Sequence, residues 1–126
     1  MIRNKSFLMF VICLVFYLFL SAPVFADKTT VEIDAPSAVQ KGDTVTIKIN
    51  VSHNGNNFMH HTNWVYVKAG GKEIGRWEYS MTNLPENEKF TKEVKFTVTE
   101  AVEIEAEGNC NIHGSAGKKI QKISVK

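Results

Sequence analysis

Residues Asp43–Val51, Asp-Thr-Val-Thr-Ile-Lys-Ile-Asn-Val, alternate between polar and apolar side chains. Val45, Ile47, Ile49 and Val51 share one parity, and polar residues occupy the other. Because successive side chains of an extended strand point to opposite faces, this stretch predicts a β-strand with one buried face. An amphipathic helix would show apolar residues at i, i+3, i+4 and i+7, whereas here they recur at every second position.

The same period of two recurs on both sides of this stretch. Further strands are predicted at Thr30–Ile33, Asn63–Ala69, Lys72–Tyr79, Thr91–Val98, Ala101–Glu107 and Lys119–Val125. Gly70-Gly71 is typical of a two-residue hairpin turn, and Leu84–Asn87 of a longer loop. About seven short strands, each with one apolar face, predict an all-β, immunoglobulin-like sandwich. We expect its core to be filled and rimmed by the aromatic residues Trp64, Tyr66, Trp77 and Tyr79.

The first 26 residues differ in composition from the rest. Arg3 and Lys5 precede an apolar run, Phe7–Leu20, which is shorter than the roughly 20 residues that a transmembrane helix needs. The run is followed by Ser21–Ala26, which ends in a small residue and is typical of a signal-peptidase site. We therefore expect residues 1–26 to be a signal peptide cleaved after Ala26. The mature domain would be residues 27–126, periplasmic or secreted, and only an uncleaved signal would hold it at a membrane.

Charge and cysteine content narrow the function of the expected mature domain. The chain has 15 basic and 13 acidic residues, and both charges of the expected signal, Arg3 and Lys5, are basic. The mature domain is therefore neutral and lacks the basic surface that nucleic-acid binding requires. Cys13 would leave with the signal, so that Cys110 has no partner for an internal disulfide. An intermolecular disulfide, a reactive thiol or a metal ligand would each account for a lone exported cysteine.

The histidines and Cys110 gather in two short segments, SHNGNNFMHH at residues 52–61 and NCNIHG at residues 109–114. Both segments are predicted loops, and loops at one end of a sandwich meet in space. Imidazole and thiolate are ligands that borderline transition metals prefer. The sequence therefore predicts a metal site. Its candidate ligands are His53, His60, Cys110 and His113, with His61 as a further candidate.

The second segment resembles a known family. Cys110–Gly114, CNIHG, is similar to the Cys-Asn-x-His-Gly signature of the superoxide reductases, which share the desulfoferrodoxin or neelaredoxin iron-binding domain. His60–Trp64 is similar to the family's His-x-x-x-Trp, and His53 lies where the family has another histidine ligand. Ala35–Ile47 is similar to the family's first turn and second strand.

This resemblance implies an immunoglobulin-like sandwich with a mononuclear iron, four equatorial histidines and an axial cysteine. Carried over, Cys110 is the axial ligand, and the equatorial ligands include His53, His60 and His113. The implied activity is an oxidoreductase that converts superoxide to hydrogen peroxide with electrons from an external small redox protein. Lys28 matches the family's cationic residue near the open coordination position, where it would attract the superoxide anion.

Two departures from the family pattern stand out. Asp27-Lys28-Thr29 occupies the place of the family's Glu-Lys-His, so the fourth histidine is missing, and His53 and His60 are seven positions apart instead of six. His61 or the new α-amine of Asp27 could replace the missing ligand. Alternatively, a site of three histidines and one cysteine would suit copper or zinc about as well as iron.

Two other functional hypotheses remain at the level of sequence. A cupredoxin-like copper protein that transfers electrons without catalysis could use His60, Cys110 and His113, although no methionine follows Met81 to serve as the axial ligand. A metal-free or zinc-stabilised sandwich could also serve only as a binding module.

Overall fold

Alternating apolar residues build both layers of the fold. The computed structural model describes residues 27–126, and the expected signal peptide lies outside the described residues. The described elements are strands: β1 (Thr30–Asp34), β2 (Ala38–Val39), β3 (Thr44–Ser52), β4 (Thr62–Ala69), β5 (Lys72–Glu78), β6 (Lys89–Thr97), β7 (Val102–Cys110) and β8 (Lys119–Val125). Within this part of the chain there is no helix long and apolar enough to cross a membrane.

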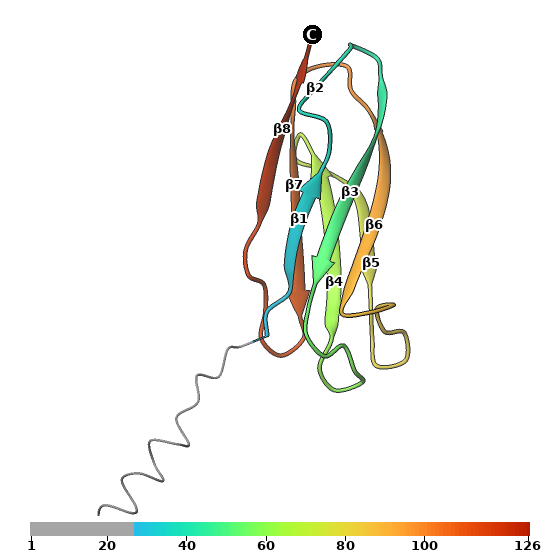
Figure 1. Cartoon of the computed structure of the whole chain (residues 1–126), viewed down its shortest axis with the longest axis vertical. Coiled ribbons are helices and arrows are strands. Elements are labelled where there is room, and N and C mark those ends of the chain that lie inside the picture. Colours follow the sequence, from blue (N-terminus) through green and yellow to red (C-terminus); the bar gives the residue numbers. More distant parts are fainter. Residues whose placement is uncertain (1–26) are drawn as a thin grey trace, which may run out of the picture.

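The strands form two sheets that face each other (Figure 1). One sheet has the order β1-β3-β6, and the other has the order β2-β8-β7-β4-β5. Neighbouring strands are antiparallel except for the short parallel pair β2–β8. This architecture confirms the predicted immunoglobulin-like sandwich. The short strand β2 was not predicted from the sequence.

The core lies between the inner faces of the two sheets. Ile47 and Ile49 of β3 are fully buried, as are Val65 of β4 and Ile104 of β7. Burying a branched aliphatic side chain of this size contributes about 1.5–3 kcal/mol, so this layer provides much of the folding free energy. The residues of β3 that face the core are those that the sequence pattern predicted, Val45, Ile47, Ile49 and Val51.

The aromatic residues divide between the two faces of the five-stranded sheet. Trp77 and Tyr79 pack against the core, as expected. Trp64 and Tyr66 have the opposite parity to the core residue Val65, so they lie on the outer face of β4, where their rings stack 5.7 Å apart. These two rings are therefore not part of the core cluster between the sheets, although Tyr66 is itself buried. The two rings cover each other by stacking. The Tyr66 hydroxyl donates to Glu105 and Glu107 of β7.

Both turn predictions correspond to connections in the structure. Gly70 and Gly71 join β4 to β5 with φ angles of 57° and 82°, which L side chains rarely adopt. Leu84–Asn87 lies in the long connection between β5 and β6. The hairpin fixes the register of β4, whose other end enters the histidine-rich region.

Strand direction gathers the chemically interesting loops at one end of the sandwich. β3 and β7 run toward this end, and β1 and β4 begin there (Figure 1). β7 continues to Cys110 instead of ending near Glu107, because Cys110 still pairs with Thr62 of β4. The expectation that Cys110 lies in a loop was therefore wrong. Its backbone belongs to the sheet, which fixes the position of its sulfur.

Candidate metal centre

The loop between β3 and β4 is folded by its asparagines. The main-chain N–H of His53 donates to Glu88 O at 2.8 Å and holds the start of the loop against the β5–β6 connection. The Oδ1 atom of Asn57 accepts the N–H groups of Met59 and His60, and the N–H of Asn57 donates to His60 O. These bonds form a tight turn that returns the chain toward His53 and fixes the main chain of His60.

The second segment is a tight turn at the end of β7. The main chains of Cys110 and Gly114 exchange two hydrogen bonds, of 2.9 and 3.0 Å. Gly114 has a φ of 83°, which favours glycine at this position. The N–H of His113 donates to Cys110 Sγ at 3.4 Å, and such a bond stabilises negative charge on the sulfur. The turn therefore places one imidazole beside one thiol.

Asn111 joins the two segments. Its Oδ1 atom accepts the N–H of His61 at 2.9 Å, and its Nδ2 atom donates to Met59 O at 3.0 Å. Its own N–H donates to His61 O at 3.0 Å. Three hydrogen bonds from one residue therefore hold the Cys110–Gly114 turn against the histidine loop.

Four side chains converge where the segments meet. His60 Nε2 lies 2.8 Å from His113 Nδ1, and His113 Nδ1 lies 3.9 Å from Cys110 Sγ. The rings of His53 and His60 have centroids 4.6 Å apart. Within residues 27–126, one ligand atom from each of His53, His60 and Cys110 lies within 4.8 Å of the others, an arrangement that could hold a metal ion. Cys110 and His53 are buried, whereas His113 is exposed.

The His53 ring is oriented by Asn56. Asn56 Nδ2 donates to Asn87 O, and Asn56 Oδ1 accepts the N–H of Thr62, so the direction of the amide is fixed. Asn56 Oδ1 also lies 2.7 Å from His53 Nδ1, which must therefore carry the proton. Burial lowers the pKa of His53 below its ordinary value of 6.5, although the hydrogen bond to Asn56 raises it. The neutral ring presents the Nε2 lone pair, which is the form that binds metals.

Two further residues singled out from the sequence, His61 and Lys28, do not belong to this converging group of four side chains. His61 is buried, and its Nδ1 atom lies 3.0 Å from Asn57 O, within its own loop. Lys28 is exposed and lines an open hollow together with Asp27 and His53. The side chain of Lys28 is therefore at the same end of the sandwich as the histidines.

Sequence reasoning missed the structural roles of Asn56 and Asn111. Each one bonds to residues that are distant along the chain, so no local pattern could reveal the contact. Asn111 lies within the CNIHG motif, and this was the one signal for it. Asn56 is one of three asparagines in a turn-forming stretch, and its sequence neighbours do not distinguish it from the others.

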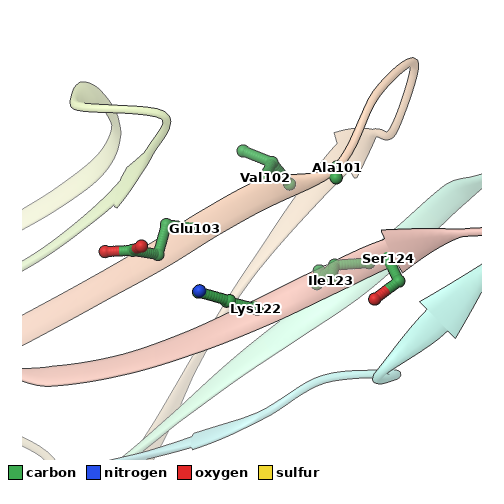
Figure 2. A pocket seen from close by; sticks show the side chains of 6 residues that line it. All are labelled: Ala101, Val102, Glu103, Lys122, Ile123 and Ser124. Atoms are coloured by element: carbon green, nitrogen blue, oxygen red, sulfur yellow. The ribbon is translucent and has the colours of Figure 1, made fainter.

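A separate hollow lies at the other end of β7. It is lined by Ala101, Val102, Glu103, Lys122, Ile123 and Ser124 (Figure 2). None of these residues is a histidine or a cysteine, and Cys110 terminates the opposite end of the same strand. This hollow is therefore separate from the candidate metal centre.

Comparison with known proteins places the chain in a family. The family model for desulfoferrodoxin matches residues 23–116. No curated protein matches the chain. A superoxide reductase (neelaredoxin) variant from Ignicoccus hospitalis has a similar structure, with a TM-score of 0.63 and 20% identity over 80% of this chain and 83% of that one.

Two further structures show how widely the fold is used. A protein from Thermotoga maritima described as a candidate superoxide reductase has a TM-score of 0.58 and 26% identity, over 77% of this chain and 86% of that one. A CARDB domain from Pyrococcus furiosus in complex with di-metal ions also has a TM-score of 0.58, with 18% identity over 82% of this chain and 99% of that one. The sandwich alone therefore does not specify one function.

The fold and the site together define a small all-β protein with imidazoles and a cysteine gathered at one end of a sandwich (Figure 1). The match to the family model covers most of the chain, including the histidine loop and the CNIHG motif. The chain belongs to the desulfoferrodoxin family.

Proposed function

We propose that this protein is an exported mononuclear iron protein that reduces superoxide to hydrogen peroxide. Family membership supports iron and the oxidoreductase class. The observation that carries the proposal is the convergence of His60, His113 and Cys110 from two segments far apart in sequence. The family match gives no support to the copper or zinc alternatives.

The donor set fits a transition metal. Two ligand nitrogens that are each about 2.1 Å from a metal and bound at right angles lie about 3 Å apart. The 2.8 Å between His60 Nε2 and His113 Nδ1 is close to this spacing. Imidazoles together with a thiolate suit iron. His53, His60, His113 and Cys110 are the residues that would hold it.

A bound iron(II) would supply one electron to superoxide, which takes up two protons to form hydrogen peroxide. The protein contributes the environment for this reaction. The N–H of His113 stabilises charge on the Cys110 sulfur, and Asn56 holds the His53 ring in one orientation. The positive charge of Lys28 at this end of the sandwich attracts the anionic substrate.

An electron donor needs a surface near the metal. Phe58, Met59 and Ile112 are 60–66% exposed although they are large and apolar. They lie on the two turns that Asn111 joins, next to the exposed His113. Exposed apolar side chains around a redox centre favour docking of a small redox protein, and these three form the proposed contact.

Export would follow from the predicted signal peptide. Cleavage after Ala26 would release a domain whose core residues lie between Val31 and Val125. Intact-mass measurement of protein recovered from the native host tests this step. A mature mass corresponding to residues 27–126 is expected, whereas a chain that keeps residues 1–26 would contradict export by this route.

Activity is tested with protein loaded anaerobically with Fe²⁺. Superoxide is delivered with a reductant present, and peroxide formation is compared with that of a metal-free control. We expect stoichiometric peroxide, and a second-order rate that falls about 3- to 10-fold in Lys28→Glu. Lys41→Glu, which makes the same charge change in the turn before β3, is the matched control. Iron-loaded protein that forms no more peroxide than the metal-free control would overturn the proposal.

A further inference from the structure

An unusual polar contact connects the start of the domain to the candidate metal centre. His53 Nε2 lies 3.1 Å from the main-chain oxygen of Asp27. The Asn56 amide fixes the ring proton on Nδ1, so Nε2 and the carbonyl oxygen are both lone-pair donors. Two such atoms repel each other at this distance, and a cation bound by both removes the repulsion. A spacing of about 3 Å also fits two ligands that are bound at right angles to one metal.

We propose that Asp27, as the first residue of the processed chain, supplies through its α-amine the ligand that the missing histidine leaves open. Its main-chain oxygen closes a chelate at the remaining position, from which superoxide would displace it. This inference rests on the proposed iron function and on cleavage after Ala26. It assigns the coordination to the main chain of Asp27 and not to its carboxylate.

The chain near Asp27 is held in place by the cysteine turn. The N–H of Thr29 donates to Gly114 O, and the N–H of Ala116 donates to Thr29 O. Thr29 is fully buried. Asp27 is two residues away from this anchor, so its main chain stays beside His53.

The other candidates for the open position are already engaged. Thr29 occupies the place of the family's fourth histidine, and its hydroxyl is hydrogen-bonded to the Thr62 hydroxyl at 2.9 Å inside the sandwich. His61 places its Nδ1 atom against Asn57 O. His61 is not part of the converging group that includes His53, His60 and Cys110.

Covalent geometry allows both Asp27 atoms to reach one ion. The α-amine and the carbonyl oxygen of one residue are separated by three bonds, so a metal bound to both closes a five-membered ring. Binding releases one proton from the amine to solvent, since only the neutral amine has a lone pair to donate. An amide nitrogen in the same position has no available lone pair, so one extra residue before Asp27 would abolish the chelate.

The test compares three forms of the domain, which contains its own core between Val31 and Val125. The first begins at Asp27, the second retains Ala26 before it, and the third begins at Asp27 but carries one alanine after Lys126. The third form is the matched control, because the C-terminus lies at the opposite end of the sandwich (Figure 1). The Kd for Fe²⁺ is measured anaerobically by competition with a chromogenic chelator. We expect Ala26 to weaken binding about tenfold or more, and the C-terminal alanine to leave it unchanged.

A second measurement separates the amine from the carboxylate. The form that begins at Asp27 is acetylated with and without Fe²⁺, and the modified sites are mapped by mass spectrometry. We expect Fe²⁺ to slow acetylation of the α-amine about tenfold while the exposed Lys41 reacts equally in both samples.

The outcomes distinguish this inference from the proposed function. Equal Kd values for the forms with and without Ala26 would overturn the chelate but not the metal centre. Acetylation of the α-amine at the same rate with and without Fe²⁺ would have the same meaning. Failure of all three forms to bind Fe²⁺ overturns the proposed function, and the chelate with it.

Discussion

His60 Nε2 lies 2.8 Å from His113 Nδ1, although the two residues are 53 positions apart in the chain. Their rings meet edge to face, with centroids 4.7 Å apart and an angle of 85° between the ring planes. Neither turn by itself contains the whole ligand set. The metal centre therefore depends on the packing of β7 against β4, because these strands bring the two turns together.

Replacement of Cys110 by serine tests the thiolate ligand. A serine hydroxyl stays protonated at neutral pH and binds soft metals poorly. We expect Cys110→Ser to lose the visible sulfur-to-metal absorption and to weaken Fe²⁺ binding more than about 100-fold. Because Cys110 is buried and the change is nearly isosteric, the metal-free variant should remain folded by circular dichroism. An unchanged visible spectrum would show that the sulfur is not a ligand.

Asn56→Ala tests the support of the His53 ring. The change leaves the N–H of the buried Thr62 without its acceptor, which costs about 1–3 kcal/mol in the free energy of unfolding. It also frees the His53 ring, and we expect Fe²⁺ binding to weaken about 10- to 100-fold. Asn54→Ala is the matched control, because Asn54 is an exposed residue of the same turn. Equal effects of the two substitutions on both measurements would contradict the role of Asn56.

Gly108→Ala tests the contact between β1 and β7. A Cβ atom at Gly108 would lie 2.7 Å from Thr29 Cγ2 and 3.2 Å from Val31 Cγ1, so β1 must shift. Overpacking of this kind costs about 1–3 kcal/mol of stability.

A second glycine serves as the comparison for Gly108. Gly75→Ala would place a Cβ atom 2.9 Å from the Trp77 ring, in β5, which β4 separates from β7. Thermal unfolding should show a loss of stability in both variants. Weaker Fe²⁺ binding is expected only in Gly108→Ala, and equal metal binding by both variants would show that the position of β1 does not matter to the site.

The ion pair between Glu86 and Lys92 predicts a pH dependence of stability. The hydrogen bond from Lys92 lowers the pKa of Glu86 below its ordinary value of 4.5. A carboxyl whose pKa is lowered by folding stabilises the native state above its unfolded pKa, and this contribution is lost as pH falls through the lower folded value. Stability should therefore decline below about pH 4.5, and Glu86→Gln should make the decline shallower. Denaturant unfolding between pH 3 and pH 7 measures the free energy of unfolding of both proteins. The same dependence of this free energy on pH in the two proteins would contradict the prediction.

Ile112→Ser tests the proposed docking surface for the electron donor. Ile112 is 60% exposed beside His113, and Ile120 of β8 is 56% exposed. With a small redox protein as donor, we expect Ile112→Ser to raise the KM for the donor about 3- to 10-fold without changing the reaction with superoxide. Ile120→Ser should leave the KM unchanged. Equal KM values for both variants would show that the donor docks elsewhere.

The fold was largely predictable because most strands have a local sequence pattern of alternating polar and apolar residues. The alternation in β3 and the Gly70-Gly71 turn specify extended chain and hairpin without any distant contact. Where distant contacts decided, the sequence pattern failed. β7 extends to Cys110 because Thr62 of β4 pairs with it. Trp64 lies on the outer face because β4 turns the parity of Val65 toward the opposite sheet.

The sequence by itself determined the sandwich, the two ligand-rich segments and the family signature, because each of these depends on residues that are close together in the chain. Only the tertiary structure decided how the ligands meet. The side-chain period fixes which face a residue occupies, but the distance between His60 and His113 depends on strands that pair across half the domain. For the same reason, the contact of Asp27 with His53 emerged only from the folded chain. Hydrogen bonds between Thr29 and the distant Gly114–Ala116 segment hold Asp27 there.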